Sequence, residues 1–445
     1  MLDQSFSADN FRRILDLANR RGVHVEDKLS MLTIRRFNEQ IRDCNIEIRV
    51  KKKAGDHAAV KALYDTKKEL RKQKSNALQT KLEEVSQNVA AKSFRIELKK
   101  VVIPGGKTLY TTPNTPEHFF ALRQIQRNIA RLFGVKQANR YAIVEQVISL
   151  LGDQFPKFII RTDIKEFYES IQHEPLLQRI NKDNLLTPFS RNILTGILKS
   201  YKTKSGSTKG IPRGIGVSAY LAELYMRDID KDLQDLRGVT YYARYVDDII
   251  LIFTPSPTEG RRDYLQEVKD IAEKKHKVRL NSAKTQSVDL RTHGTTHHFD
   301  YLGYTIQFGA GAVKTQLTTN KIDKYRKRIK IAFDHYQNLS KVDEKAARRI
   351  LVKRIRFLTG NTKLTNNKKN ILVGIYYTNN QLTELFQLDA LDGYLEGQIR
   401  RKITSDNLRT RLRKYSFKTG YEKIRFSPFT TGELSEIMEI WKKSY

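Results

Sequence analysis

The chain has 445 residues, of which 39% are hydrophobic, enough for two or three subdomains with packed cores. It carries 82 Lys and Arg against 49 Asp and Glu, a net charge of +33, and nucleic acid best explains such an excess. A single cysteine, Cys44, excludes internal disulfides and cysteine-cluster metal sites, and no apolar run reaches membrane-span length. Because the start also lacks signal-peptide character, we expect a cytoplasmic protein with no membrane partner.

The first hundred residues favour an extended helical region. Residues 31–100 are charged and nearly free of Gly and Pro, and residues 58–72 and 75–91 have the pattern of long helices with few apolar positions. Such helices form either a solvated arm or an RNA-contacting arm. The run Lys51-Lys52-Lys53 mildly favours RNA.

A hairpin is predicted next. Residues 94–103 and 108–112 have the character of strands, and Pro104-Gly105-Gly106 between them is a strong turn signal. Lys107 lies at the return of this hairpin.

A helix then begins after Thr115, because a capping residue is followed by Pro116 and by the acidic Glu117. It is expected to run to about residue 133. Basic residues recur every four positions on its outer side, where they are either solvated or face phosphates. They are Arg123, Arg127 and Arg131.

From residue 158 to 308 the pattern becomes α/β. The expected strands are residues 158–161, 241–245, 249–253 and 298–308, and the expected helices are 176–180, 188–199, 218–236 and 261–277. The second and third strands are joined by Val246-Asp247-Asp248 and read as a hairpin. Beyond residue 320 the chain is helical and very basic.

Three carboxylates belong to these strands. Asp163 ends a buried strand, and Asp247 and Asp248 sit at the tip of an apolar hairpin. Each feature alone is common, because Asp favours turns and helix caps. Together, oxygen ligands from separate segments suit Mg²⁺. Two such ions about 3.5–4 Å apart can clamp the attacking and leaving oxygens of phosphoryl transfer.

Five segments in chain order resemble the sequence motifs of reverse transcriptases. They are residues 163–171 (motif A), 210–218 (motif B), Tyr245-Val246-Asp247-Asp248 (motif C), 280–285 (motif D) and 301–304 (motif E). An ordered set of five is far more specific than one short pattern. The resemblance implies an RNA-directed DNA polymerase with an α+β, right-hand architecture of fingers, palm with an antiparallel sheet, and helical thumb.

The resemblance also implies a division of the chain. Residues 1–93 would be an N-terminal helical extension and residues 94–157 the fingers. Residues 158–308 would be the palm with fingers insertions, and residues 309–445 the basic thumb and C-terminal region.

By the same resemblance, Asp163, Asp247 and Asp248 are the catalytic, metal-binding residues. The backbone carbonyl of Ile164 is a further ligand, and the cofactor is a pair of Mg²⁺ ions, with Mn²⁺ as the alternative.

The remaining implied site residues bind the nucleotide or the primer. Those for the nucleotide are Lys107, Arg123, Tyr168, Arg213, Gly214 and Lys284, and those of the primer grip are Tyr301, Leu302, Gly303 and Tyr304. Tyr168 would exclude a 2′-hydroxyl, or be a plain core aromatic. Lys284 would assist proton transfer to pyrophosphate, or be a surface lysine. Arg213 stands where many relatives carry Gln, so template use is in question.

Residues 354–361 and 373–377 resemble the C-terminal region of defence-associated bacterial reverse transcriptases, and within them the smaller enzyme of the type 3 paired system. This implies antiviral defence, with a non-coding RNA, dNTPs, a DNA product, a second reverse transcriptase and a higher oligomer as partners. Two alternatives remain open. One is a template-independent DNA polymerase, and the other is a non-catalytic RNA-binding subunit with the polymerase fold.

Overall fold

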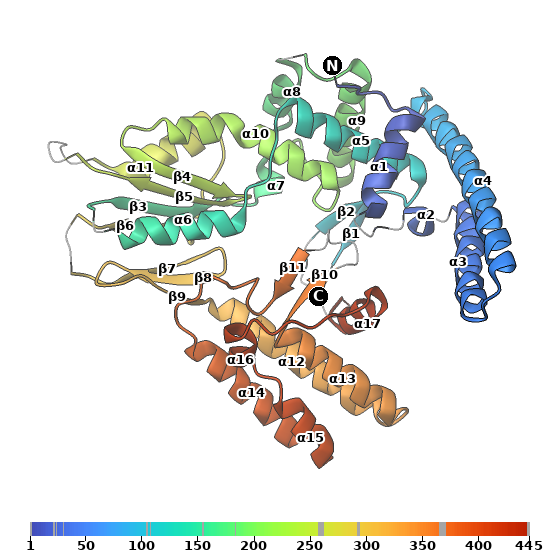
Figure 1. Cartoon of the computed structure of the whole chain (residues 1–445). Coiled ribbons are helices and arrows are strands. Elements are labelled where there is room, and N and C mark those ends of the chain that lie inside the picture. Colours follow the sequence, from blue (N-terminus) through green and yellow to red (C-terminus); the bar gives the residue numbers. More distant parts are fainter. Residues whose placement is uncertain are drawn as a thin grey trace. The chain divides into compact units, whose positions relative to one another are not determined.

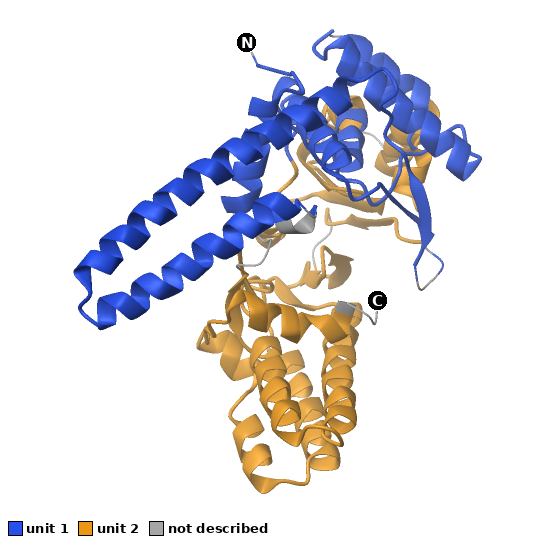
Figure 2. Cartoon of the chain, turned by 90° about the vertical axis from the view of Figure 1, so that its right-hand side faces the viewer, with its two compact units in different colours: residues 1–136, 171–225 blue, residues 137–170, 226–445 orange. Residues whose placement is uncertain are grey.

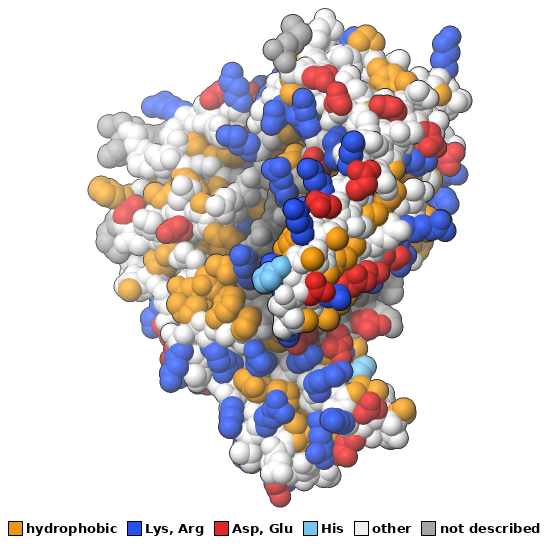
Figure 3. All heavy atoms as spheres, turned by 45° about the vertical axis from the view of Figure 1, so that its right-hand side comes forward, with side chains coloured by type: hydrophobic (Ala, Val, Ile, Leu, Met, Phe, Trp, Pro, Cys, Tyr) orange, Lys and Arg blue, Asp and Glu red, His pale blue; other side chains and the backbone are white. Residues whose placement is uncertain are grey.

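The computed structural model describes residues 2–20, 23, 25–29, 31–103, 106, 108–153, 155–182, 184–256, 262–291, 294–364 and 371–442. The chain forms two compact units, each built from two stretches of sequence (Figures 1 and 2). Unit 1 contains Met1–Lys136 and Ile171–Tyr225, and unit 2 contains Gln137–Ser170 and Met226–Tyr445. Lys and Arg side chains are spread over the face shown in Figure 3.

Unit 1 is mostly helical. Its helices are α1 (Ala8–Arg20), α2 (Val25–Lys28), α3 (Leu32–Lys53), α4 (His57–Ala90), α5 (Pro116–Leu132), α8 (His173–Lys182), α9 (Pro188–Ser205) and the first part of α10 (Gly216–Gln234). The strands β1 (Lys99–Val102) and β2 (Thr108–Thr111) pair antiparallel, which confirms the predicted hairpin with a shorter first strand. Its Lys107 lies outside the described residues.

Helix α4 is one helix where the sequence suggested two. Its interior has no Gly or Pro, and Asp56 caps it by accepting a hydrogen bond from the Ala59 N–H. Helix α4 contacts α1 and α5. Its buried apolar residues all lie in its second half, and they are Leu78, Leu82, Val85 and Val89. The first half packs along α3 (Figure 1). The predicted start of α5 is confirmed, because Thr115 caps it and Pro116 is its first residue.

Unit 2 contains two antiparallel sheets. The first has the order β4-β5-β3-β6, with β3 (Phe158–Asp163), β4 (Val239–Tyr245), β5 (Asp248–Phe253) and β6 (Gln286–Asp289). The second has the order β7-β8-β9, with β7 (His297–Tyr301), β8 (Tyr304–Phe308) and β9 (Lys314–Leu317). Helix α6 (Arg140–Gly152) shares one hydrophobic core with both sheets. The predicted α+β class and antiparallel sheet are confirmed.

Two predictions for this region were wrong in detail. The single strand expected at residues 298–308 is the β7–β8 hairpin, in which Leu302 (φ 46°) and Gly303 (φ 82°) both take left-handed conformations. The helix expected at 261–277 is the short α11 (Tyr264–Lys269), continued by a π-helical turn at Asp270–Lys275.

The rest of unit 2 is a helical bundle on its own core. Its elements are α12 (Thr319–Leu339), α13 (Glu344–Leu358), β10 (Asn361–Leu364), β11 (Ile371–Gly374), α14 (Phe386–Lys402), α15 (Asp406–Arg413), α16 (Phe417–Glu422) and α17 (Thr431–Lys442). Two strand residues join β9 to the bundle by hydrogen bonds. Thr315 exchanges hydrogen bonds with Thr383, which precedes α14, and the Leu317 N–H donates to the Gln387 side chain within α14. Among the described residues, no helix combines the length and apolar character that a membrane crossing needs.

Candidate active site

The first sheet brings two of the predicted carboxylates face to face. Strands β3 and β5 are held in place by buried isoleucines, among them Ile160 and Ile250. Their antiparallel register pairs Asp163 directly with Asp248. Directly opposed side chains in an antiparallel pair lie on the same face of the sheet, so two like charges are neighbours here. The sequence placed these two residues at a strand end and a hairpin tip, which is where they lie.

Asp247 occupies the two-residue turn between β4 and β5. The preceding Val246 has a φ of 61°, a left-handed conformation that β-branched residues rarely adopt. The Ile164 N–H donates a hydrogen bond to the Asp247 carbonyl at 3.1 Å. This bond ties the turn to the residue that follows β3. Ile164 also forms a β-bridge with Leu280.

Asp163 is held by two residues of the predicted motif D. The residue as a whole is only 4% exposed. The Lys284 ammonium donates to Oδ2 at 3.0 Å, and the Asn281 amide Nδ2 donates to Oδ1 at 3.1 Å. The Asn281 N–H also donates to the Asp163 carbonyl at 2.7 Å. Lys284 thus contacts Asp163 although its side chain is half exposed, and its role in proton transfer stays a prediction. Asn281 is a contact that the sequence did not single out.

Asp248 is paired with Arg161, whose Nη2 donates to Oδ1 at 2.9 Å. Burial raises the pKa of the Asp248 carboxyl above its ordinary value, and the nearby Asp247 and Asp163 carboxylates raise it further. Arg161 opposes this rise. Arg161 also donates to the Lys284 carbonyl at 2.8 Å, so one guanidinium links β5 to the segment that carries Lys284.

The donor chemistry of this site fits a divalent cation. The carboxylates of Asp247 and Asp163 contribute to the raised pKa of Asp248, and a hard cation bound between these groups would remove that repulsion. The predicted group of three carboxylates is not, however, assembled around a common point: among the described residues, no three His, Cys, Asp or Glu side chains are placed to hold a metal ion. Instead Lys284 balances Asp163, and Arg161 balances Asp248.

Tyr168 lies on the short helix α7 (Phe167–Ser170), five residues after Asp163. Its ring is half-buried and packs edge-on against the buried ring of Phe167 at 5.3 Å between centroids. Both interpretations of Tyr168, a core aromatic and a residue that faces the sugar, stay predictions.

Two of the predicted nucleotide-binding residues of unit 1 line a cavity beside the motif B loop. A cavity of about 250 Å³ is lined by Arg123 and Gly214, together with Gln126 and the end of β2. Arg123 donates to the Gln126 side-chain oxygen at 3.2 Å and lies over the Phe119 ring.

Backbone contacts fix that loop. The Tyr110 N–H donates to the Arg213 carbonyl at 2.7 Å. Gly214 has a φ of 112°, and a Cβ there would lie 2.6 Å from the Tyr110 carbonyl. A Cβ on Gly216 would lie 2.2 Å from the Gln126 amide nitrogen. Tyr110 and Gln126 thus shape the loop, although neither belongs to a motif that the sequence revealed.

The predicted primer-grip residues are mostly internal. The rings of Tyr301 and Tyr304 are buried in the core that α6 shares with both sheets. Burial raises the pKa of the Tyr304 hydroxyl to about 12, so this tyrosine is neutral. Leu302 is buried as well, and Gly303 is the partly exposed residue of the four. Any contact with a primer would therefore be made through the turn.

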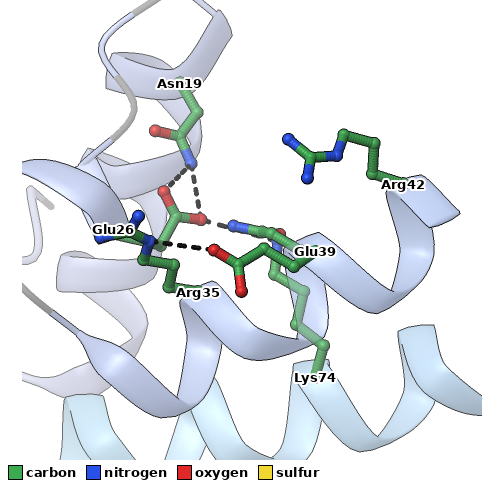
Figure 4. A pocket seen from close by; sticks show the side chains of 7 residues that line it. Asn19, Glu26, Arg35, Glu39, Arg42 and Lys74 are labelled. Atoms are coloured by element: carbon green, nitrogen blue, oxygen red, sulfur yellow. Dashed lines mark hydrogen bonds and ion pairs between the residues drawn. The ribbon is translucent and has the colours of Figure 1, made fainter.

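A second cavity lies in the N-terminal region of unit 1, with a volume of about 740 Å³ (Figure 4). The almost fully buried Glu26 accepts hydrogen bonds from the Asn19 amide at 2.9 and 3.0 Å, and Lys74 lies 3.7 Å from it. Arg35 and Glu39 pair with each other on the wall. The sequence did not single out any of these residues, because none forms a recognisable pattern.

An antiparallel sheet that sets a strand-end Asp beside an Asp-Asp hairpin defines the class of palm-type polymerases. Residues 120–306 match the family described as "Reverse transcriptase (RNA-dependent DNA polymerase)". This segment, which is less than half of the chain, is similar to a reverse-transcriptase domain, and it includes Asp163, Asp247, Asp248 and Lys284. The right-hand polymerase fold and, for this domain, the enzyme class of RNA-directed DNA polymerase are confirmed.

Solved structures of telomerase are similar at low identity. Apo telomerase from Candida tropicalis is 12% identical over 78% of this chain and 63% of that chain, with a TM-score of 0.40. A C-terminally truncated form is 15% identical over 54% and 60%, with a TM-score of 0.37. Telomerase from Candida albicans with a fragment of telomeric RNA is 13% identical over 79% and 62%, with a TM-score of 0.35. The chain thus spans less than two thirds of these proteins. No curated protein matches it.

Proposed function

We propose that the protein synthesises DNA on an RNA template. The observation that carries this proposal is the direct pairing of Asp163 with Asp248 inside a reverse-transcriptase domain. Neighbouring like charges, one buried at Asp163 and one partly buried at Asp248, are unfavourable for stability, and a bound cation would reduce that cost. A structural subunit that only binds RNA has no use for this arrangement.

In the proposed reaction, Asp163, Asp247 and Asp248 hold two Mg²⁺ ions, with Mn²⁺ as a substitute and the Ile164 carbonyl as a further ligand. Bound there, the ions would activate the primer 3′-hydroxyl and neutralise the triphosphate. Cation binding at Asp163 would free the Lys284 ammonium, which now lies 3.0 Å from that carboxylate. Lys284 is then available to protonate the pyrophosphate leaving group.

The other proposed roles concern substrate binding. Tyr168 selects deoxynucleotides by excluding a 2′-hydroxyl. Arg123 and Gly214 contact the nucleotide or template from the motif B cavity. Arg213 and Lys107 are proposed for the same role from the sequence resemblance. The turn of residues 301–304 positions the primer end.

The test is DNA synthesis by the purified full chain with Mg²⁺, dNTPs and the RNA that co-purifies with it. We expect Asp247→Asn to abolish incorporation, because an amide is a poor ligand for a hard cation. Asp323→Asn, the same change at an exposed position of α12, should retain it. No incorporation by the wild type with any co-purifying RNA, or full activity of Asp247→Asn, would contradict the proposal.

Sequencing the product decides between templated and untemplated synthesis. A repeat that copies a segment of the bound RNA supports the proposal. Random or homopolymeric DNA would support the template-independent alternative instead.

We further propose, on the sequence resemblance alone, that the protein acts in the bacterial cytoplasm in antiviral defence, with a non-coding RNA and a second reverse transcriptase in a higher oligomer. The proposed organisation is an extension (1–93), fingers (94–157), palm (158–308) and thumb (309–445). Affinity purification from phage-infected cells would test the partners. Recovery of the chain with neither RNA nor a second polymerase would refute them.

A further inference from the structure

A buried arginine binds the backbone of the turn between β4 and β5. Arg244, the next-to-last residue of β4, is almost fully buried. Its Nη1 donates a hydrogen bond to the Val246 carbonyl at 2.9 Å. Val246 has the left-handed φ of 61°, and Asp247 follows it in the turn. One side chain of β4 therefore holds the residue on which the position of Asp247 depends.

The two remaining nitrogens of the Arg244 guanidinium are bound by Asp230 of helix α10. Nε donates to Oδ1 and Nη2 donates to Oδ2, both at 2.8 Å, so the pair is bidentate. The Tyr242 hydroxyl donates to the same Oδ1 at 2.6 Å. Burial raises the pKa of this hydroxyl, and the Asp230 carboxylate raises it further, so Tyr242 stays protonated as a donor. All these residues belong to unit 2.

These bonds set the plane of the guanidinium. Because a guanidinium is planar and rigid, a side chain bound at both nitrogens by Asp230 presents its Nη1 in one direction. The Val246 carbonyl accepts that bond while its residue is left-handed, a conformation that is unfavourable for a β-branched side chain. The next carbonyl, that of Asp247, accepts from the Ile164 N–H at 3.1 Å. The turn is thus held at two successive carbonyls.

We infer that Arg244 is a positioning residue for Asp247. It holds Val246 in its left-handed conformation and so fixes where the next residue places its carboxylate. Backbone strain of this kind persists only where the surrounding structure maintains it. Arg244 acts through the backbone and not on the reacting atoms. The inference rests on the proposed function in one respect, which is that Asp247 is taken to be a metal ligand.

Arg244→Lys tests this role with a conservative change. A lysine keeps the positive charge beside Asp230, but its single ammonium cannot form the bidentate pair and also hold the Val246 carbonyl. We expect the affinity for Mn²⁺ to fall by about tenfold or more, as is typical when a group that orients a metal ligand is lost. The probe is Mn²⁺ alone, measured through the electron paramagnetic resonance signal of the free ion, with the full chain and without nucleotides.

Arg262 provides a matched control in the same unit. It forms a bidentate pair with Glu267, at 2.5 Å through both Nε and Nη2, and its Nη1 donates to the Arg237 carbonyl at 2.7 Å. That carbonyl precedes the other end of β4. Arg262→Lys therefore loses the same kind of contacts away from the turn of Asp247. Its Mn²⁺ affinity should equal that of the wild type, whatever the change in Tm.

Val246→Gly separates positioning from general support of the fold. Glycine adopts a left-handed conformation without strain, so the turn should depend less on the arginine. In a Val246→Gly background, Arg244→Lys should lower the Mn²⁺ affinity by only about twofold. An undiminished loss in that background, an equal loss in Arg262→Lys, or wild-type affinity of Arg244→Lys would overturn the inference.

Asp230→Asn keeps the inference testable if Arg244→Lys does not fold. An amide in place of the carboxylate removes one acceptor of the bidentate pair, so the guanidinium is held less firmly and the Mn²⁺ affinity should fall. Wild-type affinity in a folded Asp230→Asn would overturn the inference as well.

DNA synthesis is a separate readout. Arg244→Lys should need more Mg²⁺ for half-maximal synthesis, while its KM for dNTPs at saturating Mg²⁺ stays that of the wild type. A wild type whose Mn²⁺ affinity depends on Arg244 but which makes no DNA would contradict only the proposed activity. An active wild type whose Mn²⁺ affinity is unchanged by Arg244→Lys would contradict only the positioning role.

Discussion

At the scale of single residues, the site is organised by charges that are balanced in pairs. Asp163 is balanced by Lys284, and Asp248 by Arg161. Each pair joins a carboxylate to a cation from a different segment, and Arg161 also holds the backbone of Lys284. If a metal cation replaced the Lys284 ammonium at Asp163, the backbone of Lys284 would still be held by its hydrogen bond from Arg161. The charge balance of the site and its mechanical support depend on different atoms.

Asp248 should trade stability for activity. Its pKa is raised in the folded protein, so the folded state holds the proton more tightly than the unfolded state. The stability gained from that proton is present at low pH and lost as the pH rises through the folded pKa. At pH 7 the ionised Asp248 therefore lowers the stability of the folded protein. Asp248→Asn should raise the Tm while abolishing DNA synthesis.

The measurement is thermal unfolding of wild type and Asp248→Asn at pH 7 and at about pH 4. The difference in Tm should shrink at the lower pH, where the wild-type carboxyl is increasingly protonated. Asp323→Asn on the exposed face of α12 provides the control, with little change at either pH. A lower Tm for Asp248→Asn at pH 7 would show that the bond to Arg161 outweighs the repulsion.

The sequence predicted the positions of these carboxylates but only part of their surroundings. Asp163 and the hairpin were evident because strand ends and turns have local signals. Arg161 had a signal that was not used: it lies two residues before Asp163, so both side chains share one face of the strand. Asn281 lay within the predicted motif D, but its contact with Asp163 had no local signal, since only the folded chain brings its segment against β3.

At the scale of elements, those with local sequence signals were again predicted, and those that depend on tertiary packing were not. Elements with strong local signals, such as β4, β5 and α5, were predicted to within a few residues. The two strands are short runs of apolar and aromatic residues joined by a turn, and the start of α5 has an explicit cap. The π-helical turn after α11 and the left-handed Leu302 were not predicted, since tertiary packing imposes both against local preference. Val246 is a third case, where a β-branched residue occupies a left-handed position beside the candidate catalytic Asp247.

The motif B loop depends on close backbone packing at Gly214. We expect Gly214→Ala to destabilise unit 1 by about 2–4 kcal/mol, because the new Cβ meets the Tyr110 carbonyl and the conformation is disallowed for alanine. Gly206→Ala is the matched control. Gly206 also has a positive φ, 74°, but a Cβ there would meet nothing within 4 Å, so the cost should be about 1 kcal/mol.

Urea unfolding of the two variants checks this difference. Equal losses would mean that the loop shifts away from Tyr110 at little cost, and that the contact does not fix its shape. A loss of nucleotide affinity in Gly214→Ala but not in Gly206→Ala would also support a place for the loop in the nucleotide site.

At the scale of the whole molecule, the net charge of +33 is the feature that the fold must accommodate. Helix α12, in the region proposed as the thumb, and helix α3, in the predicted N-terminal arm, both carry basic runs. Charge of this size favours binding to a polyanion through counterion release.

The arm can be tested directly, since a solvated arm and an RNA-contacting arm make different predictions. RNA affinity of the wild type should fall by about 10³-fold or more between 50 and 200 mM salt if six or more phosphates are contacted. Each lysine that contacts a phosphate contributes about one unit to the slope of log K against log salt. Replacing the three exposed lysines that end α3 by Gln should therefore lower the slope by about one to three units. These lysines are Lys51, Lys52 and Lys53. Lys324, Lys327 and Lys330 of α12 provide the comparison set, expected to act on duplex binding. If the arm variant keeps the wild-type slope while the thumb variant does not, the arm is solvated, and the charge that binds RNA lies elsewhere in the chain.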